Sequence, residues 1–272
     1  MRTDIENQII CGDCISVMSA LPSEIARLII ADPPYFNVLL KQNWDTAWKT
    51  PEDYLHWTAR WMEGAMRLLV PGGLLYCFGQ VGKREHVMLH LMSQAASKYS
   101  FHDLIIWDRV VGYNDRRDSF TPAYEMAIVL RKEGAAPLFH KDAIRESYDT
   151  TTINLYLKDK RYKDADARRK HLEKGKYATN LWRVPSLKGN SREKVGHPSQ
   201  KPLSLIERIV LSSSAPGELV LDPFLGSGTT TAAAQKHGRR WIGIETSAHF
   251  CDVARQRLEE MRKVQTAREE AC

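Results

Sequence analysis

Short apolar runs alternate with segments of helical character along most of the chain. The apolar runs have the length of strands and end at turn residues or acids, at positions 8–11, 28–31, 74–78, 104–107, 126–130, 219–221 and 241–245. The segments between them carry helix start signals or apolar residues at helical spacing, at 14–21, 51–70, 83–96, 203–213, 229–236 and beyond Ser247. This alternation predicts an α/β fold.

The clearest helix start lies at Thr50, which can cap a helix, followed by Pro51 and two acids. Apolar residues then recur at helical spacing, at Leu55, Ala59, Met62, Met66 and Leu69. We interpret the methionines as core residues rather than as a ligand site, since Met fills irregular gaps in cores. Pro71-Gly72-Gly73 should end this helix before the next strand.

The alternation stops between about Lys132 and Val195, where basic residues gather. The chain has a net charge of +6. Residues 156–194 hold 13 Lys and Arg against 5 Asp and Glu, a local excess of +8, which leaves −2 for the remainder. Such a block on a near-neutral scaffold indicates a face that binds a polyphosphate. A solvated helix or a disordered linker are the alternatives, but interspersed aromatic and aliphatic residues favour an ordered insert.

Composition narrows the class of protein. The 272 residues are 43% hydrophobic and 26% charged, which is ordinary for a globular protein. No apolar run approaches 18 residues and the N-terminus lacks a signal-peptide core, so we expect a cytoplasmic protein. The five cysteines are an odd number, which does not suggest a disulfide framework. Cys11 and Cys14 form one CxxC pair, but no second pair follows, so we expect no metal.

The first candidate for chemistry is Asp32-Pro33-Pro34-Tyr35, directly after the apolar run 28–31. Two prolines cannot extend a strand, so the chain must leave the sheet here in a stiff turn. The turn would hold a carboxylate and a ring at the carboxyl edge of the sheet, where α/β folds bind ligands. Carboxylate and carbonyl oxygens can accept from an exocyclic amine, and a ring can stack on its base. The alternative is a turn without function.

The second candidate is Asp222-Pro-Phe-Leu-Gly-Ser-Gly-Thr-Thr230, between a strand and a helix. A glycine turn at a helix start directs backbone N–H groups at an anion, and a carboxylate suits it as well as a phosphate. No Gly-Lys-Ser/Thr follows, so it is not a P-loop. Glu245 lies about 20 residues beyond, where such folds place the acid that binds ribose hydroxyls. A dinucleotide site is the competitor, but the turn reads GSGTT rather than GxGxxG.

The DPPY motif at 32–35, followed much later by DPFLGSGTT, resembles the amino-methyltransferases of DNA. The order of the motifs is similar to the β-class, a circular permutation of the usual arrangement, and the resemblance runs from about Ile9 to Met261. It implies one Rossmann-like S-adenosylmethionine methyltransferase domain with a mostly parallel central sheet. Residues 1–131 would be the catalytic half, 132–195 an inserted target-recognition region and 196–272 the cofactor-binding half. The resemblance also suggests a homodimer.

The resemblance assigns roles to individual residues. The catalytic residues would be Asp32, Pro33, Pro34 and Tyr35. The cofactor-binding residues would be Asp13, Cys14, Asp32, Lys201, Asp222, Phe224, Gly226, Ser227, Gly228, Thr229 and Glu245. Asp13 would accept from the adenine of the cofactor, although it can equally cap a helix. Lys201 lies in a segment similar to the family's HPxQKP and would pair with the methionine carboxylate. The polar stretch 37–49 would be a lid over the site.

The activity implied is transfer of a methyl group from S-adenosylmethionine to N6 of adenine in double-stranded DNA. Asp32 and the Pro33 carbonyl would accept from the amine of a flipped-out base, and Tyr35 would stack on it. N4 of cytosine is the alternative target, and a catalytically inactive DNA-binding subunit is an alternative from another class. C5-cytosine methylation needs a Pro-Cys nucleophile that the sequence lacks. The NPPY motif of protein glutamine methyltransferases is also absent.

Overall fold

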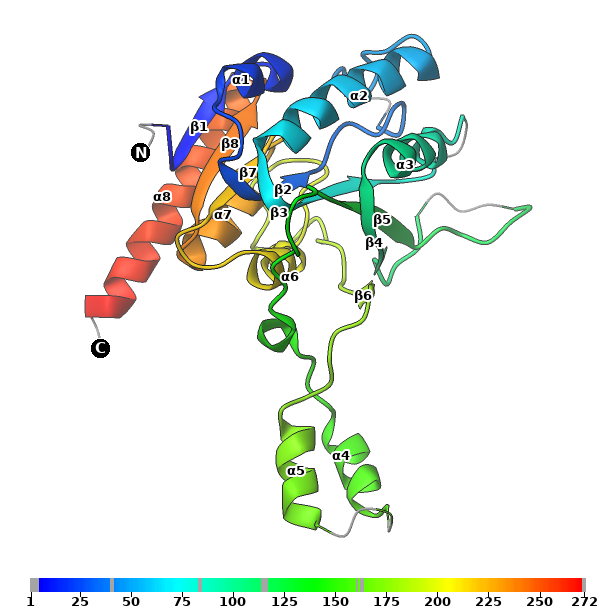
Figure 1. Ribbon diagram of the computed structural model, residues 1–272, viewed down its shortest axis with the longest axis vertical. Coiled ribbons are helices and arrows are strands. Elements are labelled where there is room, and N and C mark those ends of the chain that lie inside the picture. Colours follow the sequence, from blue (N-terminus) through cyan, green and yellow to red (C-terminus); the bar gives the residue numbers. More distant parts are fainter. Residues whose placement is uncertain are drawn as a thin grey trace.

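A computed structural model describes residues 5–39, 42–82, 85–113, 117–159, 161 and 164–270. They form an eight-stranded sheet in the order β1-β8-β7-β2-β3-β5-β4-β6, with helices on both faces (Figure 1). The strands are β1 (Gln8–Cys11), β2 (Ala26–Ala31), β3 (Leu69–Gly79), β4 (Ser100–Asp108), β5 (Tyr124–Arg131), β6 (Leu181–Arg183), β7 (Leu219–Asp222) and β8 (Arg240–Glu245). The helices are α1 (Cys14–Ala20), α2 (Pro51–Leu68), α3 (Val87–Lys98), η1 (Lys141–Ile144), α4 (Thr150–Leu157), α5 (Ala165–Glu173), α6 (Leu203–Ser213), α7 (Thr229–Lys236) and α8 (Ala248–Glu270). The predicted α/β fold with a mostly parallel sheet is confirmed.

Strands β2 and β7 are neighbours in the sheet although about 190 residues separate them in the chain. They run parallel, with Leu28 opposite Val220 and Ile29 opposite Leu221. Parallel strands end at the same edge of a sheet, so the segments that follow β2 and β7 emerge side by side. Strand β5 runs antiparallel to both of its neighbours, β3 and β4. It therefore begins at the edge where β2 and β7 end.

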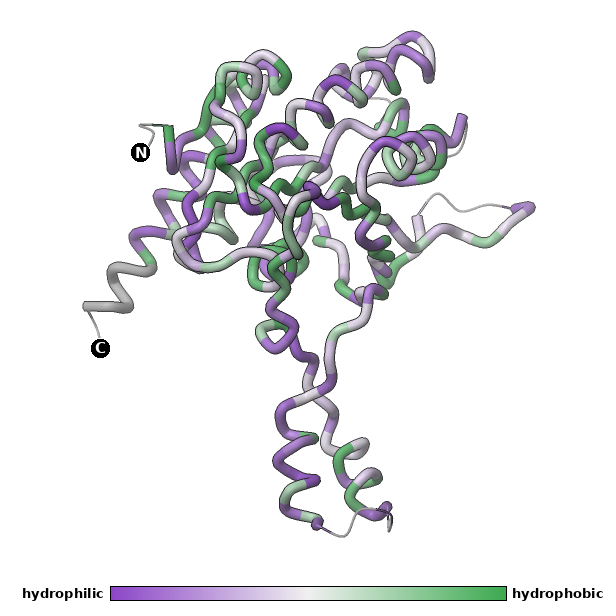
Figure 2. Tube along the Cα trace, viewed as in Figure 1, coloured by the Kyte–Doolittle hydropathy of each residue, from purple (hydrophilic) through white to green (hydrophobic). Residues whose placement is uncertain are grey.

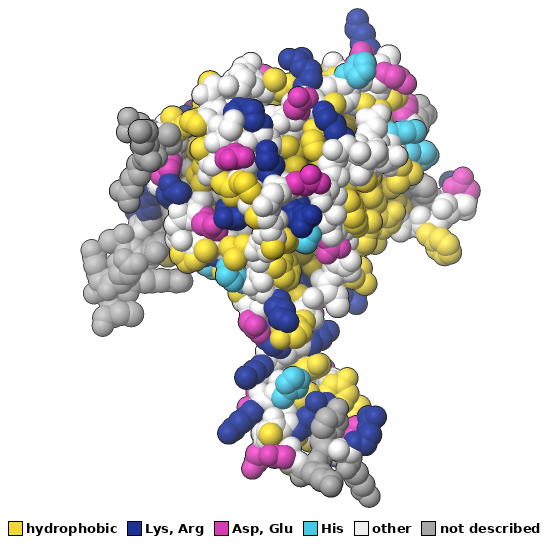
Figure 3. Space-filling view, in the orientation of Figure 1, with side chains coloured by type: hydrophobic (Ala, Val, Ile, Leu, Met, Phe, Trp, Pro, Cys, Tyr) yellow, Lys and Arg dark blue, Asp and Glu magenta, His cyan; other side chains and the backbone are white. Residues whose placement is uncertain are grey.

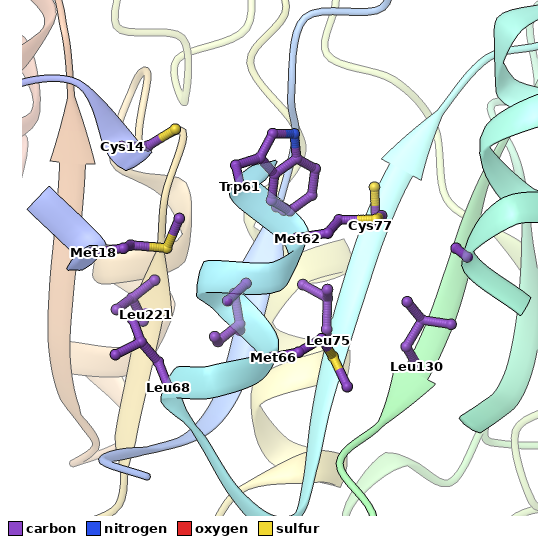
Figure 4. Packing of buried hydrophobic residues seen from close by; sticks show 14 of the residues in the cluster. Cys14, Met18, Trp61, Met62, Met66, Leu68, Leu75, Cys77, Leu130 and Leu221 are labelled. Carbon is purple, nitrogen blue, oxygen red and sulfur yellow. The ribbon is translucent and has the colours of Figure 1, made fainter. Parts of the chain in front are cut away.

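Two hydrophobic layers hold the helices against the sheet. Alternate residues of each strand face opposite sides, as the pleat requires. Ile29 belongs to a buried cluster that includes residues of α1, α2 and α3, whereas Leu28 and Ile30 belong to one that includes residues of α6, α7 and α8. Figure 4 shows the first layer, where side chains of α2 meet Met18 of α1 and the sheet. The predicted core methionines of α2 are buried in that layer.

Helix α2 begins as predicted but the following strand starts earlier than expected. Thr50 and Asp53 form a reciprocal capping box, and Pro51 is the first helical residue. The helix ends at Leu68, and β3 runs on through Pro71-Gly72-Gly73 rather than starting at Leu74. The register against β2 shifts within this stretch, and Gly72 has φ of 75°. A β-bulge tolerates Pro and Gly that a regular strand would reject.

The other predicted strands and helices are found with shifts at their ends. Helix α3 begins at Val87 instead of 83, and Lys83 and Arg84 lie outside the described residues. Strand β4 spans Ser100–Asp108, longer than the predicted 104–107. Helices α6 and α7 have the predicted bounds. Both α6 and α7 begin directly after a Pro or Gly, which marks their first turn, whereas the ends of α3 and β4 lack such a signal.

The described residues of the insert between β5 and α6 include a projecting helical hairpin, α4–α5 (Figure 1). The insert leaves the sheet after Arg131, which pairs with Leu74 near the start of β3, so it begins at the edge opposite the ends of β2 and β7. Strand β6 then returns the chain by pairing in parallel with β4. Lys and Arg side chains are scattered over the visible face of the hairpin in Figure 3. The described residues of the insert include η1, α4, α5 and β6, and the bounds and the role of the insert stay predictions.

The strands of the α/β body consist largely of hydrophobic residues, whereas helix α5 of the hairpin is mostly hydrophilic (Figure 2). Among the residues that the structure describes, no helix is both long and apolar enough to cross a membrane. The same residues contain no group of three or more His, Cys, Asp or Glu side chains arranged to hold a metal ion.

Candidate functional site

One cavity of about 320 Å³ opens at the edge where β2 and β7 end. Ligand sites of small molecules are typically about 300–1,000 Å³. Every predicted site residue except Gly228 lines it: Asp13, Cys14, Asp32, Pro33, Pro34, Tyr35, Lys201, Asp222, Phe224, Gly226, Ser227, Thr229 and Glu245. The two motifs therefore share one pocket. Gly228 precedes α7 with φ of 76°, and a Cβ there would lie 3.0 Å from that of Ala254, so close packing explains this glycine.

The Asp-Pro-Pro-Tyr turn is held rigidly at the mouth of this cavity. The Pro34 carbonyl accepts from the Tyr54 hydroxyl at 2.7 Å. The Tyr35 N–H donates to the Asp45 carboxylate at 2.6 Å, and the N–H groups of Val38 and Leu39 donate to its other oxygen. One buried carboxylate thus folds the following loop back onto the turn. That loop lines the cavity, and its predicted role as a lid stays a prediction.

Four side chains form a compact charged group beside the turn, which we call the Asp32 cluster: Asp32, Tyr35, Glu125 and Lys201. The Lys201 ammonium lies 2.9 Å from Asp32 Oδ1, 3.0 Å from Glu125 Oε2 and 3.0 Å from the Tyr35 hydroxyl. The Tyr35 hydroxyl donates to Asp32 Oδ1 and lies 3.1 Å from Glu125 Oε2. Asp32 thus faces both a cation and a phenol.

Glu125 is the site residue that the sequence did not reveal. Its second oxygen, Oε1, accepts from Gln80 Nε2 at 3.1 Å and from Arg109 Nη1 at 3.0 Å. Burial alone would raise the pKa of Glu125, but Lys201 and Arg109 hold it below its ordinary value. The available signal was an acid directly before the apolar run 126–130, at the start of β5. An acid in a buried strand requires a partner, although the sequence does not say which one.

Burial also governs the ionisation of the other members of the Asp32 cluster. It raises the pKa of Asp32 above its ordinary value, and the nearby Lys201 only partly opposes this. Burial lowers the pKa of Lys201, but the nearby carboxylates of Asp32 and Glu125 raise it by more. The pKa of Lys201 is therefore above its ordinary value and the ammonium stays charged. The predicted pairing of Lys201 with a cofactor carboxylate stays a prediction, and in this structure its partners are Asp32 and Glu125.

The glycine turn after β7 forms the other side of the cavity. Gly226 has φ of 50°, which favours glycine, and its N–H donates to Glu245 at 2.9 Å. The second oxygen of Glu245 accepts from the Ser247 N–H at 2.8 Å, so the carboxylate is fixed at the rim. Burial raises the pKa of Asp222 to about 7. Asp222 also accepts from the Phe224 N–H at 2.9 Å, which shapes the turn.

Asp13 and Cys14 reach the cavity from the start of α1. Asp13 caps the helix by accepting from the Ser16 N–H at 2.9 Å, so the capping interpretation is confirmed. Burial raises the pKa of Cys14 to about 12, which keeps it a thiol. His197 packs edge-on against Phe250 at 4.5 Å between ring centroids, and burial lowers its pKa to about 4. Cys14 and His197 therefore contribute uncharged surface to the cavity wall.

The donors and surfaces of the cavity fit S-adenosylmethionine. Fixed acids at Asp13 and Glu245 offer acceptors for amine and hydroxyl groups, and Phe224 and Phe250 offer apolar contact. The Ser227 and Thr229 hydroxyls lie 3.1 Å apart at the start of α7 and can serve a carboxylate. A positive sulfonium suits a pocket with several carboxylates.

Comparisons with known proteins agree with this geometry. The model of the N6/N4 methylase family, described as DNA methylase, matches residues 26–256. The chain is 31% identical over 255 residues to DNA adenine methyltransferase YhdJ of Escherichia coli, covering 92% of this chain and 82% of that protein. It is 29% identical over 277 residues to type II methyltransferase M.HinfI of Haemophilus influenzae, covering 95% and 70%.

Two solved structures show the same fold. TTHA0409 from Thermus thermophilus, named as a DNA modification methylase and solved with S-adenosyl-L-methionine, matches with a TM-score of 0.63 at 22% identity, covering 93% of both chains. The PvuII DNA methyltransferase, named as cytosine-N4-specific, matches with a TM-score of 0.66 at 17% identity, covering 94% of this chain and 90% of that one. At these identities the likeness shows the fold alone.

Proposed function

The chain belongs to the N6/N4 family of DNA methylases, and we propose that it transfers a methyl group from S-adenosylmethionine to N6 of adenine in double-stranded DNA. One observation carries the proposal. Asp32, at the end of β2, and the glycine turn after β7 line the same cavity. An acceptor for an exocyclic amine therefore faces a site suited to the methyl donor.

Some residues of the cavity are proposed to bind the cofactor and others to bind the target base. Asp13 is proposed to accept from the adenine amine of the cofactor and Glu245 from its ribose hydroxyls. The turn Gly226–Thr229 is proposed to hold the methionine end. When bound, S-adenosylmethionine supplies a methyl group activated by the positive sulfur. The structure of TTHA0409 with this cofactor supports the assignment.

Positioning and electrostatics account for the transfer step. The lone pair of an aromatic amine is delocalised into the ring. Asp32 and the Pro33 carbonyl are proposed to accept its two N–H hydrogens, which favours a tetrahedral nitrogen whose lone pair can attack. The Pro34 carbonyl is already used by Tyr54, so the Pro33 carbonyl is the better acceptor. The base has to leave the duplex, and stacking on an aromatic ring returns about 1–3 kcal/mol.

The Tyr35 side chain has to rotate before its ring can stack on the target base. Its hydroxyl donates to Asp32, the acceptor proposed for the amine. An incoming amine would replace this hydrogen bond, which releases the ring. The proposal therefore includes a rotation of Tyr35 when the target base enters.

Adenine is preferred over cytosine because Asp precedes Pro-Pro-Tyr and because YhdJ is named as an adenine methyltransferase. N4 of cytosine remains the second candidate, since PvuII DNA methyltransferase, with the same fold, is named as cytosine-N4-specific. The exocyclic amines of the two bases need the same acceptors. The choice therefore depends on the walls of the pocket that touch the ring.

The insert at 132–195 is proposed to recognise DNA in two places. The end of the insert after β6 leads directly into His197, Gln200 and Lys201, which line the cavity. It is proposed to contact the DNA nearest the flipped base. The hairpin α4–α5 begins at the opposite edge of the sheet, and its exposed Arg169 and Lys170 are proposed to contact phosphates farther away. A homodimer would bring a second hairpin, and light scattering would measure that assembly.

Labelled methyl transfer to unmethylated duplex DNA tests the proposal. Digestion to nucleosides and mass spectrometry should find N6-methyladenine in the wild-type reaction and about 10²–10³-fold slower formation of it with Asp32→Ala. N4-methylcytosine instead would establish the second candidate. Tight DNA binding without any transfer would establish an inactive DNA-binding subunit, and a parallel reaction with RNA would reveal an RNA methylase.

A further inference from the structure

The Lys201 ammonium has all of its hydrogen-bonding capacity used inside the Asp32 cluster. An ammonium group carries three N–H donors. Its oxygen neighbours are Asp32 Oδ1 at 2.9 Å, Glu125 Oε2 at 3.0 Å and the Tyr35 hydroxyl at 3.0 Å. The side chain is 6% exposed. A cofactor carboxylate could bind Lys201 only by displacing one of these partners.

Glu125 is anchored from the side away from Lys201. Arg109 and Gln80 occupy its Oε1, whereas Lys201 and the Tyr35 hydroxyl face its Oε2. These groups come from β5, the end of β4, the end of β3 and the entry to α6. The anchored acid therefore fixes the position of the ammonium relative to Asp32.

The charges of this group balance. Asp32 and Glu125 are two acids, and Lys201 and Arg109 are two bases, each in contact with an opposite charge. A buried charge persists only when it is paired. Lys201 compensates both carboxylates, and Glu125 keeps the ammonium from being drawn entirely to Asp32.

We propose that Lys201 and Glu125 are a positioning pair for Asp32, in which the ammonium orients the carboxylate that receives the target amine and Glu125, held by Arg109, orients the ammonium. This role deepens the proposed methyl transfer and rests on it. It assigns Lys201 to the site of the methyl acceptor instead of the carboxylate of the cofactor.

The pair acts on Asp32 with opposite signs. Burial raises the pKa of Asp32, the positive Lys201 lowers it, and the negative Glu125 raises it again. The titratable groups that face Asp32 from the elements around it are Tyr35, Tyr54, Cys77, Glu125, Lys201 and Asp222. Of these, Lys201 and Glu125 have the largest charge effects on Asp32. Activity requires an ionised Asp32, so it should rise with pH as Asp32 loses its proton.

The test is the pH profile of kcat/KM for Lys201→Met and Glu125→Gln. Lys201→Met should move the acidic limb to higher pH, by about one pH unit or more, and Glu125→Gln should move it to lower pH. The double variant should lie between them. Lys201→Arg keeps the charge and should leave the limb near that of the wild type. A purely structural role would not produce shifts of opposite sign.

Calorimetry of S-adenosylmethionine binding separates this role from the alternative. Lys201→Met should change the cofactor Kd by less than about threefold, because the proposed contact is with Asp32. A tenfold or larger loss of cofactor affinity with an unmoved acidic limb would overturn the proposal. Shifts of the same sign in both variants would overturn it as well.

Two further measurements keep the test decisive. If Lys201→Met does not fold, Arg109→Gln replaces it, since the Arg109 side chain is 23% exposed. Loss of Arg109 should move the acidic limb of the pH profile in the same direction as Lys201→Met, but by less. The Asp32 carboxyl can also be titrated by ¹³C NMR, assigned by its loss in Asp32→Asn. That titration measures the effect of Lys201 and Glu125 on the pKa of Asp32 and does not depend on methyl transfer. If the wild-type protein transferred no methyl group to DNA, the proposed function would be refuted, and the titration would still test the positioning pair. An Asp32 titration unchanged in both charge variants would refute the pair.

Discussion

The Asp32 cluster and the hairpin α4–α5 use charge in opposite ways. In the cluster, Lys201 and Glu125 are each 6% exposed and every charge meets an opposite one. On the hairpin, Arg161 is 84% exposed, and Leu172 of α5 is the buried residue of the two helices. Buried, balanced charges hold atoms in place in a medium of low polarity, whereas exposed charges attract a distant polyanion and are weakened by salt. The first arrangement suits chemistry and the second suits capture of DNA.

The two regions also differ in what supports them. The cluster is assembled from the turn after β2, the start of β5 and the entry to α6, so the α/β body fixes it. At the base of the hairpin the two chain segments are joined by a short antiparallel bridge, in which Glu146 and Lys176 exchange backbone hydrogen bonds at 2.9 Å. Changes in the cluster should therefore alter catalysis, and changes in the hairpin should alter DNA affinity with the body intact.

The largest effect should follow from Asp32→Ala. Loss of the acceptor for the target amine should lower kcat by about 10²–10³-fold, as for other preorganised groups that act in the transition state. Cofactor affinity should survive at least in part, since the glycine turn and Glu245 remain. Single-turnover methyl transfer and calorimetry measure the two quantities. Asp252→Ala, on the exposed face of α8, is the matched control, and full activity of Asp32→Ala would remove Asp32 from the mechanism.

The next effect should follow from replacing residues 147–175 by Asn-Gly, which joins Glu146 to Lys176 through a two-residue hairpin turn. The body should fold and bind S-adenosylmethionine unchanged. DNA affinity should fall by about tenfold or more, and the slope of log K against log salt should decrease by about 0.9 for each phosphate that the hairpin no longer neutralises. Fluorescence anisotropy at several salt concentrations measures both.

A finer version of the same experiment keeps the hairpin. Arg169 and Lys170 are exposed on α5 and Lys174 is exposed at its C-cap. Their joint replacement by Gln should reproduce part of the loss of affinity and of the salt slope. Lys98→Gln on α3, where the side chain is 52% exposed, is the control. An unchanged salt slope in the triple variant would show that the hairpin has another role.

The sequence could predict features that depend on neighbouring residues, but not contacts between residues that are far apart in the chain. The turn at Asp32 and the turn at Gly226 each follow a strand directly, and short-range signals of Pro and Gly identify them. That they share a pocket depends on the pairing of β2 with β7, which the motif order and the family resemblance implied but no local pattern contains. The helix that starts at Pro51 was predictable for the same local reason, through its capping box.

Glu125 shows what the sequence could not supply. Its partner Lys201 lies 76 residues farther along the chain, and only the antiparallel placement of β5 brings the two side chains together. Lys201 was recognisable as a site residue, but its contacts with two acids were not. The geometry of the insert was hidden for a related reason, because β6 is a strand of three residues and gives no periodic signal.

Asp222 provides a smaller effect that links the pocket to stability. Burial raises its pKa to about 7 from an ordinary value near 3.8. Between these values the folded protein keeps a proton that the unfolded chain has released, so the stabilising contribution is full below pH 3.8 and is lost as the pH rises to 7. Asp222→Asn should therefore stabilise the protein at pH 8 by roughly 1–4 kcal/mol and change it little at pH 4. Urea unfolding at the two pH values measures this, and equal effects at both would contradict the assignment.

The smallest effect should come from Asp45, the buried acid that holds the loop at the mouth of the cavity. Asp45→Asn keeps the size of the side chain but replaces one of the two oxygens that accept from Tyr35, Val38 and Leu39. A buried N–H left without an acceptor costs about 1–3 kcal/mol, and opening the loop relieves that cost. Tyr35 should then be held less firmly and kcat/KM should fall by about tenfold, with global stability nearly unchanged. Limited proteolysis should show faster cleavage between Tyr35 and Lys49, and Asp53→Asn, at the helix cap just beyond the loop, is the control. If Asp45→Asn left both cleavage and kcat/KM unchanged, the loop would have no part in holding the target base, and catalysis would depend on the Asp32 cluster alone.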